Sequence, residues 1–307
     1  MKVFVTGVGG QLGHDVMNEL AKRGHEGVGS DIAPVYSGIQ DGSAVCGMPY
    51  VQLDITDGAW VRRALEQIRP DAVVHCAAWT AVDAAEAPEN REKVRAINVD
   101  GTRHIAEACQ ALGCKLMYFS TDYVFDGQGE APWQPDCDAF APLNYYGETK
   151  LGGEQAVKAL LERYFILRIA WVFGLNGKNF IKTMLRLGET HDTLRVVNDQ
   201  IGTPTYTLDL ARLVVDMIGT EQYGCYHATN EGGYISWADF AAEIFRQADM
   251  PVRVMPVTTA EYGLSTAARP FNSRLDRSKL PESGFTPLPD WRDAVRRYLD
   301  EMKKSAV

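Results

Sequence analysis

The sequence predicts an α/β protein built on a doubly wound parallel sheet, with a second, smaller and discontinuous domain. In the first half of the 307 residues, short apolar runs alternate with amphipathic segments of helical periodicity. A glycine-rich turn directly follows the first apolar run. After about residue 175 the alternation weakens, and Pro-containing loops separate shorter helices. We expect residues 1–174 to form the larger domain, with a returning segment near 222–248, and residues 175–221 and 249–307 to form the smaller one.

The elements are expected in a regular order along the chain. Strands are predicted at 2–6, 26–30, 72–76, 115–120 and 165–169, with Cys225-Tyr226-His227-Ala228 returning as a last strand. Helices are predicted from about residue 11 to Gly24 and at about 57–69, 89–112 and 144–163. Residues 33–49 contain several glycines and two prolines and are expected to form a surface loop insertion. Helices on both sides of a parallel sheet complete the doubly wound arrangement.

The glycine-rich turn has the spacing Gly-x-x-Gly-x-x-Gly over residues 7–13, between a strand and a helix. In this context, Gly7 permits the tight turn, Gly10 lets the backbone approach a pyrophosphate, and Gly13 lets the helix pack close to the strand. The pyrophosphate would lie at the amino end of the helix, where free N–H groups and the helix dipole favour an anion. With Gln11 and Leu12, these residues predict a Rossmann-type dinucleotide site.

Acidic residues after the next two apolar runs are candidates for the adenosine half of the cofactor. The carboxylate of Asp31 could accept from the ribose hydroxyls and would repel a 2′-phosphate, which favours NADH, although Lys22 and Arg23 keep NADPH open. A solvated loop aspartate is the alternative. Asp54, followed by Ile55, could accept from the adenine amino group or could equally cap the helix that begins near residue 57.

Tyr146 stands four residues before Lys150 on a predicted helix, so that the phenol and the ammonium share one face. A neighbouring cation favours the phenolate, so we expect the tyrosine pKa to be lowered from its usual value of ~10. Such a phenol can act as a general acid or base. Tyr145 has Thr149 at the corresponding position and offers no such pairing.

The carboxyl ends of the predicted strands are where ligands bind in open α/β sheets. Thr121 lies at one such end and could donate to a substrate carbonyl while Tyr146 supplies a proton. Small residues at another strand end, Ala77 and Ala78, would let the cofactor pass. Asn98, inside the 89–112 helix, could fix Lys150 through a water, although a helix asparagine is often simply exposed.

Composition excludes several classes of function. A net charge of −9 argues against a general nucleic-acid surface. No apolar stretch approaches the ~20 residues of a membrane span, and Met1 leads directly into the first strand, leaving no room for a signal peptide. The six cysteines form no Cys-x-x-Cys pair. We therefore expect a cytoplasmic protein with reduced thiols and no zinc site.

Several segments resemble the extended short-chain dehydrogenase/reductase family over essentially the whole chain, and within it the dTDP-4-dehydrorhamnose reductases. They are 6–13, 76–83, 120–127, Tyr146 with Lys150, 168–174, 179–180, 198–205 and 269–275. The resemblance implies reduction by NADH or NADPH of the C4 keto group of dTDP-4-dehydro-L-rhamnose, with Thr121, Tyr146 and Lys150 as the catalytic residues. It places substrate contacts at Thr80, Val82, Tyr123, Trp171 and Asn179.

Physical arguments add Arg269, Arg274 and Gln200 to the substrate candidates and bear on Trp171 as well. Arg269 and Arg274 could each bind a diphosphate through the guanidinium fork. Gln200 could contact the sugar, and simple turn formation is as good an explanation for its segment. Trp171 could cover the apolar face of a deoxysugar, with core packing as the alternative.

Other members of the same fold suggest alternative functions. Nucleotide-sugar dehydratases carry an acidic pair after the threonine, whereas here Asp122 is followed by Tyr123, which disfavours elimination. A non-catalytic regulatory subunit would have lost Thr121, Tyr146 or Lys150. Some reductases of the family are described as dimers joined through magnesium held by glutamates. Asp15 stands at one such position but Thr190 at another, so we expect no bound metal, and a monomer or a homodimer.

Overall fold

Within residues 1–305, the part of the chain that the computed structural model describes, seven parallel strands form the central sheet. Their order is β11-β6-β5-β4-β1-β2-β3. The strands span Lys2–Thr6 (β1), Glu26–Asp31 (β2), Tyr50–Gln52 (β3), Ala72–His75 (β4), Lys115–Thr121 (β5), Tyr164–Ile169 (β6) and Gly224–His227 (β11). The doubly wound parallel fold predicted from the sequence is therefore confirmed.

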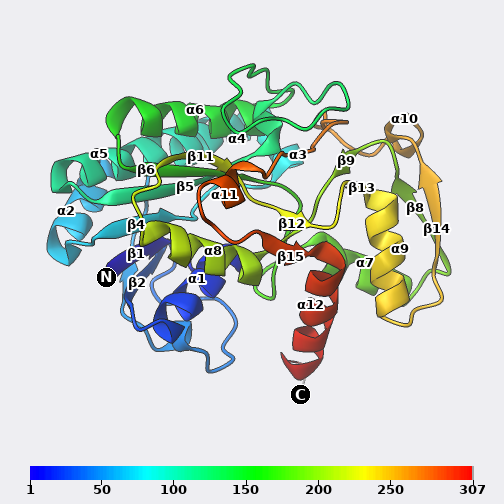
Figure 1. Ribbon diagram of the computed structural model, residues 1–307, viewed down its shortest axis with the longest axis horizontal. Helices are drawn as coiled ribbons and strands as arrows, with labels where there is room; N and C mark the ends of the chain where they lie inside the picture. The colour runs from blue at the N-terminus through cyan, green and yellow to red at the C-terminus, as the bar shows by residue number, and fades with distance from the viewer. Residues whose placement is uncertain (306–307) are drawn as a thin grey trace.

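The strands are apolar on both sides because helices cover both faces of the sheet. Val3 and Val5 of β1 face one core, whereas Phe4 faces the other. Figure 1 shows the two helical layers. One layer contains α1 (Gln11–Lys22) and α8 (Thr207–Ile218), and the other contains α2 (Gly58–Ile68), α5 (Thr102–Leu112) and α6 (Tyr145–Leu160).

The expected strands are all present, including the last strand, to which the chain returns after the smaller domain begins. Strand β11 pairs in parallel with β6, with Tyr226 opposite Leu167. The predicted helix 89–112 is interrupted: it consists of α4 (Pro88–Arg95), a π-helical turn η2 (Ala96–Gly101) and α5. The π turn inserts extra backbone where the Asn98 side chain bonds to the backbone of Trp79.

A second hydrophobic core forms beyond the sheet from α7 (Phe180–Gly188), α9 (Trp237–Gln247) and α12 (Trp291–Ser305). Strands β8 (Thr193–Val197) and β14 (Arg253–Val257) pair beside it, at the right of Figure 1. The expected domain boundaries differ from this arrangement at two helices. Helix α8 packs on α1 and belongs to the sheet, whereas α9 belongs to the second core, because each buries its apolar face there.

Short elements connect these parts. They are η1 (Ala44–Cys46), α3 (Val82–Ala85), η3 (Asp122–Val124), β7 (Val172–Phe173), β9 (Ile201–Gly202), β10 (Thr205–Tyr206), β12 (Asn230–Glu231), β13 (Ile235–Ser236), α10 (Thr259–Tyr262), α11 (Lys279–Glu282) and β15 (Leu288–Asp290). Among residues 1–305, no helix is both long and apolar enough to cross a bilayer.

The predicted surface insertion 33–49 is more firmly anchored than a free loop. Val45 is fully enclosed in the core beneath α1, and its N–H donates to the Asn18 side chain at 2.9 Å. The Tyr36 hydroxyl lies 2.5 Å from His14 Nδ1, also on α1. The insertion is thus held against the helix that follows the glycine-rich turn.

The strand order reverses between β1 and β4, because the chain builds outward from β1 to β3 and then continues from β4 on the other side. The loops after these two neighbouring strands diverge in opposite directions and leave a crevice at their carboxyl ends. Gly7 follows β1 at this point, and Cys76 follows β4. The fold therefore places the glycine-rich turn and the small residues after β4 side by side.

Candidate active site

The glycine-rich turn has the geometry that its spacing predicts. Gly7 has a φ of 71°, and a Cβ on it would lie 2.6 Å from the Ala77 nitrogen. A Cβ on Gly13 would collide with the Gly7 carbonyl oxygen, so only glycine lets α1 start this close to β1. A Cβ on Gly10 would meet only the Gly7 oxygen, at 3.2 Å. The backbone at Gly10 is thus open to the space above it.

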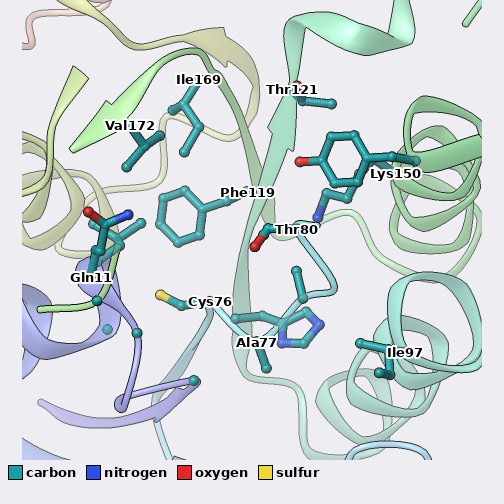
Figure 2. Close-up of a pocket in the computed structure, with 18 of the residues that line it drawn as sticks. Gln11, Cys76, Ala77, Thr80, Ile97, Phe119, Thr121, Lys150, Ile169 and Val172 are labelled. Carbon is teal, nitrogen blue, oxygen red and sulfur yellow. The ribbon is translucent and has the colours of Figure 1, made fainter. Parts of the chain in front are cut away.

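That space is a cavity of about 1000 Å³ along the carboxyl ends of the strands. Most of the candidate residues line it: Gly7, Gly10, Gln11, Leu12, Gly13, Asp31, Asp54, Ile55, Ala77, Ala78, Thr80, Val82, Thr121, Tyr123, Tyr146, Lys150 and Trp171. In Figure 2, Gln11, Ile169 and Val172 lie on one side of the cavity and Thr121 and Lys150 on the other. Candidate cofactor and catalytic residues thus share one continuous space.

Asp31 lies at the carboxyl end of β2 and is held by backbone N–H groups. Its Oδ2 accepts from Gly9 at 2.9 Å, and its Oδ1 accepts from Ile32 at 2.8 Å. The basic residues that kept NADPH open lie elsewhere. Lys22 and Arg23, at the far end of α1, both bond to Glu19. The carboxylate therefore faces the cavity without these cations beside it.

The alternative role considered for Asp54, capping the following helix, belongs to another residue. Asp57 caps α2 by accepting from the Trp60 N–H at 2.9 Å. Asp54 instead accepts from the backbone N–H and the hydroxyl of Thr56, at 2.9 and 2.7 Å, and lines the cavity. Its carboxylate retains acceptor capacity toward that space.

Helix α6 positions two of the candidate catalytic side chains. Asn144 caps this helix by accepting from the Gly147 N–H at 2.8 Å, which sets the first turn carrying Tyr146. The Tyr146 ring packs edge-on against Tyr123, with the centroids 5.7 Å apart. Tyr145 points elsewhere and donates its hydroxyl to the Arg91 carbonyl at 3.1 Å. The structure thus separates the two neighbouring tyrosines as the spacing predicted.

The expected lowering of the tyrosine pKa is not produced by the protein groups alone. Burial raises the pKa of Tyr146, and the nearby Asp122 and Tyr123 raise it further, whereas the Thr121 hydroxyl lowers it. Burial lowers the pKa of Lys150 to about 7, which weakens the cation that the expectation relied on. The Lys150 ammonium lies 4.1 Å from the centroid of the Tyr118 ring. The phenol of Tyr146 is therefore a protonated acid.

Asn98 is buried and not exposed, and it is not among the residues that line the cavity, so its expected role of fixing Lys150 through a water stays a prediction. Its side chain accepts from the Trp79 N–H at 2.8 Å and donates to the Trp79 carbonyl and the Thr149 hydroxyl. Thr149 in turn donates to the Tyr146 carbonyl at 2.9 Å. Asn98 thus connects the loop after β4 to the helix that carries Tyr146.

Trp171 has a φ of 50° and lines the cavity, but one face of its indole is already covered. Trp237 stacks on it with ring centroids 3.7 Å apart and an interplanar angle of 17°. Trp171 therefore packs against Trp237 and also lines the cavity, so both interpretations of this residue hold. Trp237 was not among the candidates, because nothing in its local sequence distinguishes it from a core residue at a helix start.

Other cavity residues were also missed by sequence reasoning. Lys178, in the loop between β7 and α7, contributes an exposed ammonium, and Phe180 follows it. Asp122 also lines the cavity. The glycine and asparagines around Lys178 indicate a loop at a strand end, and this pattern could have pointed to Lys178 as a site residue.

Four candidate substrate residues lie outside the set of described residues that line the cavity: Asn179, Gln200, Arg269 and Arg274. Asn179 caps α7 and donates to Gln11, Gly174 and Tyr298, so its amide is used within the protein. Gln200 is buried and donates to Thr259.

The two arginines are also bound by the protein. Arg274 donates to Asn272 at 3.1 Å. Arg269 donates to Asp83 at 2.6 Å and to the hydroxyl of the cavity residue Tyr123 at 3.3 Å. Of these four residues, Arg269 therefore lies beside a cavity residue, whereas the expected substrate contacts of the other three have no support from the geometry.

A glycine-rich dinucleotide turn and a Thr-Tyr-Lys group around one cavity define an oxidoreductase of the extended short-chain dehydrogenase/reductase class. Comparison with known families is more specific. The model of the RmlD substrate binding domain family matches residues 1–304, and the chain belongs to this family.

Individual relatives agree with this assignment. The chain is 42% identical to a dTDP-4-dehydrorhamnose reductase of Streptomyces griseus, over 95% of this chain and 91% of the relative. It is 39% identical to a dTDP-4-dehydrorhamnose reductase of Bacillus anthracis solved in complex with NADP, with a TM-score of 0.87 and coverage of 98% and 99%. An ortholog from Clostridium acetobutylicum is also 39% identical, with a TM-score of 0.88 and coverage of 99% and 100%.

Proposed function

We propose that the protein reduces the C4 keto group of dTDP-4-dehydro-L-rhamnose to the alcohol of dTDP-L-rhamnose, using NADH or NADPH. The observation that carries this proposal is the single cavity shared by the glycine-rich turn and by Thr121, Tyr146 and Lys150. The substrate class is taken from the relatives, which are named dTDP-4-dehydrorhamnose reductases.

The residues of the turn fit a dinucleotide. A Cβ on Gly7 or Gly13 would fill the space that the close strand–helix approach leaves, while Gly10, the N-cap of α1, opens to the cavity. The pyrophosphate would meet the N–H groups of the first turn of α1, which begins at Gln11. Asp31 would accept from the adenosine ribose hydroxyls, and Ala77 and Ala78 would lie beside the cofactor without obstructing it. When bound, the reduced nicotinamide supplies a hydride to the substrate carbonyl carbon.

The catalytic roles follow from protonation state and position. Tyr146 is a protonated phenol, and it would transfer its proton to the carbonyl oxygen as negative charge develops there. Thr121 would donate a hydrogen bond to the same oxygen. Lys150, one helical turn after Tyr146, would stabilise the resulting phenolate and hold the proton that restores it.

The substrate would contact Thr80, Val82, Tyr123 and Trp171, all of which line the cavity. The accessible part of the Trp171 indole would contact the apolar face of the deoxysugar. Arg269 would reach the diphosphate only by exchanging its bond with Asp83 for one with the substrate.

The experiment is a spectrophotometric assay with dTDP-4-dehydro-L-rhamnose and each reduced cofactor separately, with the product sugar identified by NMR. We expect one NADH or NADPH oxidised per sugar reduced. Conversion of dTDP-glucose without added reductant would instead support a dehydratase. The absence of turnover with either sugar would support the regulatory alternative.

A further inference from the structure

Asp122 directly follows Thr121 and is a buried carboxyl with an unusual set of contacts. Its side chain is 2% exposed and lines the cavity. Oδ1 lies 2.9 Å from the Thr121 hydroxyl oxygen. Oδ2 is buried and has no hydrogen-bond partner among the residues that the structure describes. An ionised carboxylate buried with one oxygen unsatisfied is costly, and a neutral acid avoids most of that cost.

The surroundings of this carboxyl shift its protonation equilibrium toward the neutral acid, and a bound ligand would shift it further. Burial raises the pKa of Asp122 to about 6, against the smaller influence of the nearby Ser273 and Thr121 hydroxyls, which lower it. The phenols of Tyr146, from α6, and of Tyr123 are the other titratable groups near it. A nucleotide sugar in the cavity would exclude water and add negative charge, and both effects raise the pKa of a carboxyl.

The protonation state of Asp122 determines which hydrogen bonds the Thr121 hydroxyl can make toward the cavity. A threonine hydroxyl has one hydrogen to donate and can accept two. The Thr121 oxygen already accepts from the Tyr123 N–H at 3.2 Å. With Asp122 ionised, the only hydroxyl hydrogen of Thr121 is donated to Oδ1, and Thr121 can then only accept from the cavity. With Asp122 neutral, the acid donates to Thr121, whose own hydrogen is free to point into the cavity.

We propose that Asp122 is a positioning residue whose proton decides whether Thr121 donates a hydrogen bond to the substrate oxygen or accepts one from it. The proposal rests on the reductase function given above. A carbonyl oxygen only accepts hydrogen bonds, so reduction requires the neutral acid, whereas the hydroxyl of the alcohol can donate to the other state. An ionised Asp122 would also oppose the negative charge that develops on the carbonyl oxygen.

Asp122→Asn tests this directly, because the asparagine amide can donate to Thr121 at every pH and carries no charge. In the wild type, the kcat of reduction should fall about tenfold per pH unit above the pKa of Asp122 in the complex. In Asp122→Asn that decline should be absent. Asp122→Ala should lower kcat at all pH values, because Thr121 is no longer oriented. Asp126→Asn, outside the cavity, is the matched control and should keep the wild-type profile.

Lys150, one turn from Tyr146, has a pKa near 7 and could produce a pH dependence of its own. The Asn variant separates the two groups, because it removes only the contribution of Asp122. A decline of the same size and midpoint in Asp122→Asn would overturn the proposal. The absence of reduction by the wild type would instead overturn the proposed function.

A second measurement does not depend on turnover. Infrared difference spectra of the protein loaded with dTDP and reduced cofactor, which cannot react because dTDP carries no keto sugar, should at neutral pH contain the carbonyl stretch of a protonated carboxylic acid that is missing from Asp122→Asn. An ionised Asp122 in the loaded wild type at neutral pH would refute the neutral-acid state, whether or not the variant folds well.

Discussion

Removal of the Tyr146 hydroxyl is the most direct test of the proposed chemistry. In Tyr146→Phe the ring still packs edge-on against Tyr123, so the cavity keeps its shape while the acid is lost. A positioned proton donor contributes about 10²–10⁴ in rate. At about 1.36 kcal/mol per tenfold change, kcat should therefore fall by the equivalent of about 3–5 kcal/mol. The remaining rate would come from Thr121 and from binding.

Tyr145→Phe is the matched control, because it removes the same atom from the neighbouring residue. The Tyr145 hydroxyl donates to the Arg91 carbonyl near the surface, so its loss should cost about 0.5–1.5 kcal/mol of stability and leave kcat within a few fold. Single-turnover cofactor oxidation, with cofactor affinity from fluorescence titration, separates chemistry from binding. Equal losses of kcat in the two variants would refute the assignment of Tyr146.

Three further outcomes are expected. Asp31→Asn should raise the ratio of kcat/KM for NADPH to that for NADH by about tenfold or more, because a carboxylate near a 2′-phosphate repels it by about 1–4 kcal/mol; an unchanged ratio would place the adenosine elsewhere. EDTA should leave activity unchanged, since Thr190 stands where the resemblance expects a carboxylate; loss of activity that Mg²⁺ restores would contradict this. Burial would raise the pKa of Glu154, but the bonds from Arg168, at 2.8 Å, lower it below its usual 4.5, so the pair stabilises the fold above that pH and less as pH falls through the lowered pKa. Glu154→Gln should therefore lose about 3–5 kcal/mol at neutral pH, with a smaller difference in acid, in denaturant titrations.

The geometry of the glycine-rich turn could be predicted from the sequence. Each of its contacts involves either residues within the turn or residues that directly follow a strand. Gly7 adopts a positive φ and Gly13 packs against the Gly7 carbonyl for reasons that any strand–turn–helix unit of this spacing shares. The same locality explains why Tyr146 and Lys150, four residues apart on one helix, could be paired in advance. The doubly wound parallel sheet was likewise predicted from the alternation of apolar runs and amphipathic segments, whereas the order of its strands comes from the structure.

Long-range packing decided what the sequence did not. Helix α8 packs on the sheet, whereas α9 packs in the second core. Both helices are amphipathic, so their sequences do not show which core each apolar face is buried in. Trp237 stacks on Trp171 although the two residues are far apart in the sequence, so this contact could not be read from local patterns.

The protonation states at the active site also depended on tertiary structure. Intrinsic side-chain chemistry and the Tyr-Lys spacing suggested a lowered phenol pKa, but burial reversed the direction for Tyr146 and weakened the Lys150 cation. The unsatisfied oxygen of Asp122 is likewise a property of the folded chain. The sequence by itself predicted that the glycine-rich turn, Thr121 and the Tyr146–Lys150 pair meet at one cavity, because strand ends and helix spacing are local. Only the tertiary structure decided which of them carry protons, because desolvation depends on everything that surrounds a side chain.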